Sequence, residues 1–374
     1  MAIILLSSVP LRQTRGNSVY ASSLTNEIKK KEKVFLIQPS FANSKVIKKK
    51  LLTIINIKVN KNFNQKEPKF YYNVEREIQK IDKQFNVSIV HILYGHYFKK
   101  FISKIEFKLV WTCHNVPPNE YSFEGLKNIF FIRFLLKIFI LFYHMYLIYR
   151  ANYNLIIVNS KRVEKIFFCL KFLLPKIKII GCGHSFLKIL RGNKLKKINE
   201  IKLLTIASFK PHKKLENILT LAKQLDIDKI KYKWIILSDK YNDQYQNKIL
   251  KLKKKNALRN IKFLSKISEK EKNNLYKKSD IYVQTSSEEG FCIPFLEASC
   301  HNNLMVLGTP TGAMPEISKI FGCNICFNEN EFLYHIKQKL NNNFKQRYIS
   351  NKKLYEWSWP NIAKKTIDSY NKIK

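Results

Sequence analysis

SSEEGFCIPFLEAS, residues 286–299, is the most informative stretch of the chain, because it joins a short buried strand to a helix and carries carboxylates in both the loop and the helix. Residues 280–284, DIYVQ, are typical of such a strand. Gly290 permits a tight turn, and Pro294 suits the first turn of a helix because its missing N–H needs no partner there. The stretch therefore predicts a strand, a turn and a helix whose first N–H groups are open to a ligand.

The same stretch carries groups that suit a nucleotide sugar. The N–H groups of Phe291, Cys292 and Ile293 would lie at the positive end of the helix, which attracts a phosphate or a polar hydroxyl. Glu297 could accept two hydrogen bonds from a ribose diol, and Glu289 in the loop could reach the sugar. Taken alone, these residues also fit an ordinary strand-turn-helix with acidic residues near the helix start.

Four further segments carry a resemblance along most of the chain. With the pattern Glu-Gly-Phe-x-x-Pro-x-x-Glu-Ala, they resemble retaining glycosyltransferase family 4, the glycosyl transferases group 1, which have the GT-B fold. The segments are LLTIASFKPHKKLENIL (203–219), NIKFLSKISEKEKNNLYKKSDIYVQTSS (260–287), GTPTGAMPEI (308–317) and YEWSWPNIAKKTIDSY (355–370).

The resemblance implies an α/β chain with two Rossmann-like, doubly wound domains facing across a cleft. The N-terminal, acceptor-binding domain would span residues 1–185, and the C-terminal, nucleotide-sugar-binding domain residues 186–357. Residues 358–374 would form a helix that crosses back to the first domain. The length agrees, because 374 residues exceed what one core usually supports.

Short apolar runs alternate with helical patterns in both halves, which indicates parallel sheets with crossover helices. The strands expected in the first half are residues 3–8, 34–37, 87–93, 107–112, 155–158 and 177–180. Those expected in the second half are residues 203–207, 234–237, 261–264, 281–284 and 305–307.

The resemblance also implies that a helix amino end and a basic pair, rather than a metal ion, hold the departing diphosphate. Lys214 matches the family's lysine in the basic loop, and Phe209 stands where many members carry an arginine. Lys210, or Arg12 on the acceptor side, would supply the missing cation, or else phosphate binding would be weaker, and the sequence leaves these alternatives open. Gly290 completes the donor-binding set, and no metal or cofactor besides the nucleotide sugar is expected.

The first domain offers three histidines and a glycine. LVWTCHNVPP, residues 109–118, places His114 just past a strand end, where open α/β sheets bind ligands, and the resemblance implies a histidine there close to the reacting sugar. His91 and His96 could line the acceptor cleft or pack in the interior. Gly16 would let the first strand-to-helix turn approach the donor, but this turn is not a GxGxxG fingerprint, so a nicotinamide enzyme is not expected.

A formal net charge of +41, from 68 Lys and Arg against 27 Asp and Glu, requires an explanation. Nucleic acid would suit it, but the lysines are spread over every expected helix and no nucleic-acid-binding motif is present, so this partner is not expected. The anionic face of a membrane is a second partner that would explain the positive charge. A bias of an AT-rich genome toward Lys, Asn and Ile explains it without a partner, and these two explanations stay open.

NIFFIRFLLKIFILFYHMYLIYR, residues 128–150, has the length to span a bilayer, but Arg133 and Lys137 interrupt it. With His144 they fall on one side of a helix, although two isoleucines share that side. The segment favours a basic, aromatic-rich surface helix at an anionic membrane, where a lipid-linked acceptor would be found. The alternative is a largely buried core helix.

The N-terminal residues and the cysteines indicate the cellular compartment of the protein. The first residues do not make a convincing signal peptide. Seven cysteines, an odd number, indicate reduced thiols rather than a disulfide framework, and the lone CxxC at residues 323–326 is interpreted as structural. The expected location is the cytoplasm, or the inner face of the plasma membrane if residues 128–150 bind lipid.

The expected function is transfer of a sugar from a UDP- or GDP-linked donor to a hydroxyl of a glycan or lipid-linked acceptor. The resemblance implies retention at the anomeric carbon, and the expected role is the synthesis of a bacterial surface polysaccharide such as lipopolysaccharide, capsule or exopolysaccharide. Cys292, where the family usually has Gly or Ser, would narrow the sugar pocket. The alternatives are a GT-B sugar-nucleotide epimerase, which needs no acceptor, and a basic nucleic-acid-binding protein.

Overall fold

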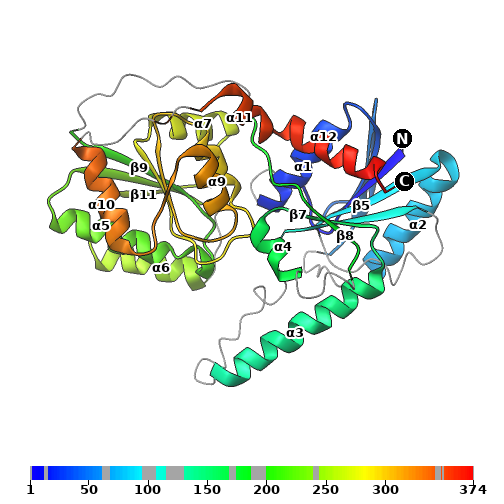
Figure 1. Cartoon of the computed structure of the whole chain (residues 1–374), viewed down its shortest axis with the longest axis horizontal. Helices are drawn as coiled ribbons and strands as arrows, with labels where there is room; N and C mark the ends of the chain where they lie inside the picture. Colours follow the sequence, from blue (N-terminus) through cyan, green and yellow to red (C-terminus); the bar gives the residue numbers. More distant parts are fainter. Residues whose placement is uncertain are drawn as a thin grey trace. The chain divides into compact units, whose positions relative to one another are not determined.

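The structure is a computed structural model, and it describes residues 2–11, 16–60, 68–94, 107–114, 130–167, 174–186, 199–238, 244–341, 347 and 349–373. The chain divides into two compact units. The first unit comprises Met1–Gly183 and Trp359–Lys374, and the second comprises His184–Ser358. Each unit has a mainly parallel sheet joined by helices, which confirms the predicted α/β class (Figure 1).

The first unit contains an eight-stranded sheet with the order β3-β4-β2-β1-β5-β6-β7-β8. Its neighbouring strands are parallel, except that β3 pairs antiparallel with β4 at the sheet edge. The strands are β1 (Ala2–Ser7), β2 (Lys33–Ser40), β3 (Lys45–Lys49), β4 (Leu52–Lys58), β5 (Val87–Tyr94), β6 (Lys108–Cys113), β7 (Leu155–Val158) and β8 (Lys176–Ile179). Strands β1 and β7 are buried throughout, as parallel strands covered on both faces are.

The second unit contains a six-stranded parallel sheet with the order β11-β10-β9-β12-β13-β14. The strands are β9 (Ile201–Ile206), β10 (Tyr232–Leu237), β11 (Ile261–Leu264), β12 (Ile281–Gln284), β13 (Met305–Gly308) and β14 (Asn324–Ile325). The helices are η5 (Pro211–Lys213), α5 (Leu215–Ile227), α6 (Gln244–Lys255), α7 (Glu269–Lys278), α8 (Ile293–Ser299), α9 (Met314–Phe321), α10 (Glu329–Leu340) and α11 (Asn351–Glu356). Trp234, Leu203, Ile281 and Met305 lie level on four adjacent strands and form one layer of the core.

The expected strands are all present, with ends shifted by a few residues, but β3, β4 and β14 were not predicted. The sequence of β3, KVIKK, is mostly exposed and lacks an apolar run. Strand β14 has only two residues, too few for a periodic pattern.

Helix α12 returns the end of the chain to the first unit. The helices of this unit are α1 (Gly16–Ile28), α2 (Pro68–Phe85), α3 (Phe130–Ala151), α4 (Lys161–Phe167) and α12 (Trp359–Asn371). Helix α12 packs against α1 (Figure 1). Beneath it, the fully buried His91 hydrogen-bonds the Tyr370 hydroxyl through Nδ1 at 2.6 Å and the Thr112 hydroxyl through Nε2 at 2.7 Å. Burial, with the nearby His114, lowers the pKa of His91 to about 3, so the ring is neutral at pH 7.

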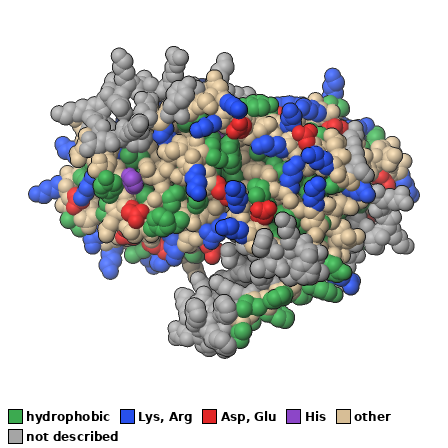
Figure 2. Space-filling model, viewed as in Figure 1, with side chains coloured by type: hydrophobic (Ala, Val, Ile, Leu, Met, Phe, Trp, Pro, Cys, Tyr) green, Lys and Arg blue, Asp and Glu red, His purple; other side chains and the backbone are tan. Residues whose placement is uncertain are grey.

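Helix α3 exposes an aromatic and aliphatic face. The exposed large side chains are Leu135, Ile138, Phe139, Phe142, Tyr143, Tyr146 and Tyr149, and Figure 2 shows hydrophobic side chains along this segment. His144, Met145 and Ile148 are buried, so His144 does not belong to the exposed face of α3. The side chains of Arg133 and Lys137 lie outside the described residues. Within the described ranges, no helix combines the length and hydropathy needed to cross a bilayer.

Tyr370→Phe tests the buried link between α12 and β5. The change leaves Nδ1 of His91 without its partner in the interior. We expect the free energy of unfolding to fall by about 1–3 kcal/mol, measured by urea denaturation. Tyr355→Phe is the control, because Tyr355 is 52% exposed and should cost little. Equal effects of the two changes would show that the His91 hydrogen bond does not stabilise the packing of α12.

Candidate functional site

Three loops meet at the carboxyl edge of the second sheet, where open α/β sheets bind ligands. They follow β9 (207–214), β12 (285–292) and β13 (309–313). The Ser287 N–H donates to the His212 carbonyl at 2.8 Å. The Thr309 hydroxyl donates to the Ser286 carbonyl. The loop predicted to bind the donor is therefore held by both neighbouring loops.

Glu289 is buried in this edge, with 8% of its side chain exposed. Its Oε1 accepts hydrogen bonds from the Lys213 ammonium at 2.6 Å and the Ser286 hydroxyl at 2.8 Å. Burial alone would raise the pKa of Glu289, but the charge and hydrogen bond of Lys213 lower it below its ordinary value. Burial alone would lower the pKa of Lys213, but Glu289 raises it. Each charge therefore keeps the other ionised in an interior that would not tolerate either alone.

The contact with Glu289 is made by Lys213, which was not predicted, and not by Lys214. Lys214 is the N-cap of α5 and adopts a left-handed conformation with φ 49°. Phe209 is buried in the core of the second unit, and Lys210 is exposed on the same loop. Shifting the sequence comparison by one residue would put Ser208 and Lys213 at the two positions assigned to Phe209 and Lys214. Because Lys213 and Lys214 are adjacent, the sequence alone could not decide which of them occupies the family's lysine position.

Glu297 lies in α8, with 11% of its side chain exposed. Its Oε1 accepts from the Lys272 ammonium and its Oε2 from the Tyr276 hydroxyl, both at 3.0 Å. Burial would lower the pKa of Lys272, but Glu297 raises it. Lys272 and Tyr276 are four residues apart on α7 and so share one helical face. This spacing was the sequence signal that could have found both partners of the predicted ribose ligand.

The N-terminus of α8 has no side-chain cap. Its N-cap, Cys292, lies two residues after Gly290 and adopts a left-handed conformation with φ 76°, which costs a residue with a Cβ about 1–2 kcal/mol. Burial raises the pKa of the Cys292 thiol, which is therefore neutral. Phe291 packs on Trp357, with ring centroids 5.9 Å apart. The N–H groups of Cys292 and Ile293 have no acceptor among the described residues and are available to a ligand.

His114 lies just past β6 in the first unit and is half-buried. Its Nε2 hydrogen-bonds the Leu93 carbonyl at 2.8 Å, and because a carbonyl only accepts, Nε2 carries the proton. Nδ1 lies 3.5 Å from the side-chain amide of Asn159. The ring packs edge-on against Tyr20 at 4.6 Å. The tautomer therefore leaves Nδ1 as the acceptor.

The other predicted residues of the first unit do not form one site. His91 is fully buried with both ring nitrogens hydrogen-bonded, so it is a packing residue rather than part of an acceptor surface. Gly16 is the first residue of α1 and is exposed, and a Cβ added there would have no atom within 4 Å. Arg12 and His96 lie outside the described residues. Of the residues that are described, no three His, Cys, Asp or Glu side chains lie together in a way that could hold a metal ion.

Residues 188–354 match the family model of the glycosyl transferases group 1. A comparison with curated proteins finds no match. Solved structures of similar fold include a sucrose-phosphate synthase from Thermosynechococcus elongatus, with TM-score 0.75, 14% identity and coverage of 100% of this chain and 99% of that one. A trehalose-phosphate synthase from Burkholderia xenovorans has TM-score 0.74, 9% identity and coverage of 99% and 100%. The Anabaena protein HepE has TM-score 0.71, 14% identity and coverage of 99% of both chains.

These findings confirm the resemblance inferred from the sequence. Residues 188–354, within the second unit, carry a glycosyl transferases group 1 domain, and the fold is GT-B. The matched segment, which is less than half of the chain, is thus similar to the glycosyl transferases group 1. At identities of 9 to 14%, the solved structures show the fold of this chain but not its substrate.

Gly312→Ala tests the packing around Glu289. Gly312 has φ 58°, and a Cβ there would lie 2.7 Å from Cβ of Glu289. We expect chemical denaturation to show a loss larger than the about 1–2 kcal/mol of a left-handed alanine, because Glu289 must also move. Gly322→Ala is the matched control, since its φ is 67° but its Cβ would meet nothing nearer than 3.6 Å. Equal losses would contradict tight packing at Glu289.

Proposed function

We propose that the chain transfers a sugar, with retention, from a UDP- or GDP-linked donor to a hydroxyl of a glycan or lipid-linked acceptor in surface polysaccharide synthesis. The observation that carries the donor half is the Lys213–Glu289 pair in the loops around the uncapped N-terminus of α8. A buried cation and open N–H groups at one sheet edge suit a diphosphate.

Each residue has a distinct role in this proposal. Lys213 and the N–H groups of Cys292 and Ile293 would bind the diphosphate. Glu289, fixed through Oε1, would accept hydrogen bonds from the sugar hydroxyls. Glu297, held by α7, would bind the ribose diol. No step requires a metal ion, because the lysine and the helix end supply the positive charge.

The charges of the pair match those that develop during transfer. Breaking the bond to the diphosphate leaves negative charge on the phosphate and positive charge on the ring carbon. Lys213 would stabilise the first charge, and the ionised Glu289 would favour the second. Before a donor binds, each is the counter-ion of the other; an entering diphosphate would share the charge of Lys213. The resemblance also assigns His114 of the first unit to positioning the reacting sugar and the acceptor.

Two structures of similar fold support the substrate classes. The Anabaena protein was solved with UDP and glucose. The Burkholderia xenovorans trehalose-phosphate synthase was solved with glucose-6-phosphate. They favour a UDP-sugar as the donor and a saccharide as the acceptor of this chain.

A panel of UDP- and GDP-sugars tests the function by thermal shift and product analysis. The correct donor should add about 2.7 kcal/mol of stability at a hundred times its dissociation constant. Lys213→Ala should lower turnover by about 10² to 10³ because it removes a preorganised cation. Lys214→Ala is the matched control, with an expected loss under about tenfold.

If Lys214→Ala lowers turnover more than Lys213→Ala does, then Lys214 rather than Lys213 binds the diphosphate. Conversion of the donor into an epimer without an acceptor would contradict the transferase proposal. So would the absence of stabilisation by every nucleotide sugar.

We also propose that the enzyme works in the cytoplasm, at the anionic inner face of the membrane. The exposed face of α3 supports this, because aromatic and aliphatic side chains insert at the headgroup boundary while basic residues attract anionic lipid. The chain supplies the charge, with a formal net value of +41. The described cysteines are free, which suits a reducing compartment.

Vesicle co-sedimentation tests the role of α3. The protein should bind vesicles containing phosphatidylglycerol and bind neutral phosphatidylcholine vesicles much less. Phe139→Ser with Phe142→Ser should weaken binding roughly tenfold, because both side chains are more than half exposed on α3. Phe327→Ser with Tyr334→Ser removes equally exposed rings from the second unit and should change little. Equal effects of the two pairs, or no vesicle binding at low salt, would contradict the proposal.

A further inference from the structure

A groove of about 420 Å³ lies in the second unit, at the carboxyl edge of the sheet and between the N-terminal halves of α5 and α10. These two helices pack side by side on one face of the sheet (Figure 1). The volume is in the range of small-molecule sites. The buried side chains of Leu221 from α5 and Phe332 from α10 form the base. The groove therefore stands directly on the hydrophobic core of the second unit.

The groove opens on the face of the second sheet that carries α5 and α10. Val283 of β12 and Leu307 of β13 pack in the core with these two helices. Because side chains alternate between the faces of a strand, Thr285 and Thr309, two residues further along, point to the same face, and both line the groove. Gln284, one residue out of step, points to the opposite face, where its amide belongs to the hydrogen bonds around the proposed donor site. The groove and the donor site are thus on opposite faces of the same loops.

The hydroxyls of Thr285 and Thr309 can only accept hydrogen bonds from a ligand. A threonine hydroxyl has a single hydrogen to donate. Thr285 donates it to the Lys214 carbonyl at 3.0 Å, and Thr309 donates it to the Ser286 carbonyl. These bonds also hold the wall of the groove against the neighbouring loops. A ligand that contacts either hydroxyl must therefore supply the hydrogen, as the hydroxyl of a sugar does.

Phe327 places an aromatic ring at the rim of the groove. Its N–H donates to the Glu331 carboxylate at 3.0 Å, and the side chain of the next residue, Asn328, caps α10 by accepting from the Glu331 N–H. The backbone around the ring is therefore fixed, while the ring itself is 74% exposed. The electron-rich face of an aromatic ring suits the weakly positive C–H groups on one face of a sugar ring. Phe327 thus offers a preformed stacking surface beside polar groups.

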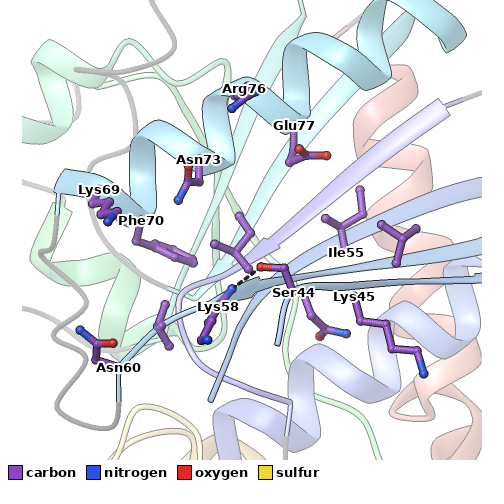
Figure 3. A pocket seen from close by; sticks show the side chains of 14 residues that line it. Ser44, Lys45, Ile55, Lys58, Asn60, Lys69, Phe70, Asn73, Arg76 and Glu77 are labelled. Carbon is purple, nitrogen blue, oxygen red and sulfur yellow. Dashed lines mark hydrogen bonds between the residues drawn. The ribbon is translucent and has the colours of Figure 1, made fainter. Parts of the chain in front are cut away.

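The lining of the groove does not suit an anionic ligand. None of the nine described residues that line it is lysine or arginine, and the one charged side chain among them is Glu329. By contrast, the hollow beside β4 and α2 in the first unit is lined by three lysines and an arginine, as well as one glutamate (Figure 3). The remaining polar groups of the groove include the amides of Asn217 and Asn330, which offer both donors and acceptors. Such a surface suits an uncharged ligand with many hydroxyls.

We propose that this groove binds an uncharged saccharide, one ring of which stacks on Phe327. The hydroxyls of the saccharide hydrogen-bond the amides of Asn217 and Asn330 and donate to Glu329 and Thr309. The site rests on the groove alone and lies outside the donor site, so it does not depend on the proposed glycosyltransfer. That function only makes a glycan the nearest source of the ligand.

Isothermal titration with maltotriose, cellotriose and triacetylchitotriose tests the proposal, with trigalacturonate as the anionic probe. At least one neutral trisaccharide should bind about tenfold more tightly than trigalacturonate, because Glu329 repels the anion. Phe327→Ala should weaken that binding roughly tenfold, since it removes the stacking ring, and Phe327→Trp should keep it within about twofold. Tyr334→Ala is the matched control: it removes a ring of α10 that is 59% exposed outside the lining, and it should change binding less than about twofold.

Asn330→Ala repeats the test if Phe327→Ala lowers Tm, with an expected weakening of roughly threefold or more and Gln338→Ala, outside the lining of the groove, as its control. No binding of the three neutral trisaccharides would overturn the proposal. So would equal weakening by Phe327→Ala and Tyr334→Ala, or tighter binding of trigalacturonate than of every neutral probe. UDP titrated separately distinguishes the two sites: failure of UDP binding contradicts the donor site around Lys213, and failure of the trisaccharides contradicts the groove.

Discussion

The edge of the second sheet depends on the buried ion pair between Lys213 and Glu289. Removing two charges from water costs several kcal/mol for each, and the pair is tolerated only when the geometry is good and further hydrogen bonds support it. Ser286 supplies one such bond to Glu289, and the Gln284 amide donates to Ser286 at 2.7 Å. The position of the carboxylate is therefore set by buried polar residues of β12 and its loop. Gly312 completes the arrangement, because a side chain there would collide with Glu289.

The strands could be predicted because most of them are continuous apolar runs buried on both faces. The run in β7, LIIV, is unambiguous in this respect. The sequence signal fails at the edge of the sheet: β3 satisfies its hydrogen bonds through β4 but presents lysines to water, so its composition resembles that of a loop. The C-terminal helix was predicted from a family resemblance. Its physical cause, the buried contact of Tyr370 with His91, joins residues 279 positions apart and has no local signal.

The candidate site was only partly accessible from the sequence. Glu289 and Glu297 lie in one segment and were predicted because that segment resembles the family's signature, since their spacing alone also fits an ordinary strand-turn-helix. Their partners come from other segments, and among adjacent lysines the choice depends on which side chain the backbone turns toward the carboxylate. The left-handed conformation of Lys214 gives this turn, and it leaves Lys213 facing Glu289. His114 was predicted from its place after a strand, and it does lie just past β6, whereas the same reasoning could not tell that His91 is buried.

The net charge of +41 contains lysines of different kinds, which composition cannot separate. A coding bias supplies lysines wherever they do no harm, and exposed ones such as Lys30, with 61% of its side chain exposed, fit that explanation. Lys213 and Lys272 do not, because their side chains are only 17% and 13% exposed and a buried ammonium without a partner is strongly destabilising. Each has a glutamate at 2.6 to 3.0 Å, and a bias toward lysine does not place glutamates opposite the buried ones. The exposed lysines are thus compatible with coding bias or with an anionic partner, whereas each of the two lysines beside Glu289 and Glu297 is matched by a specific glutamate.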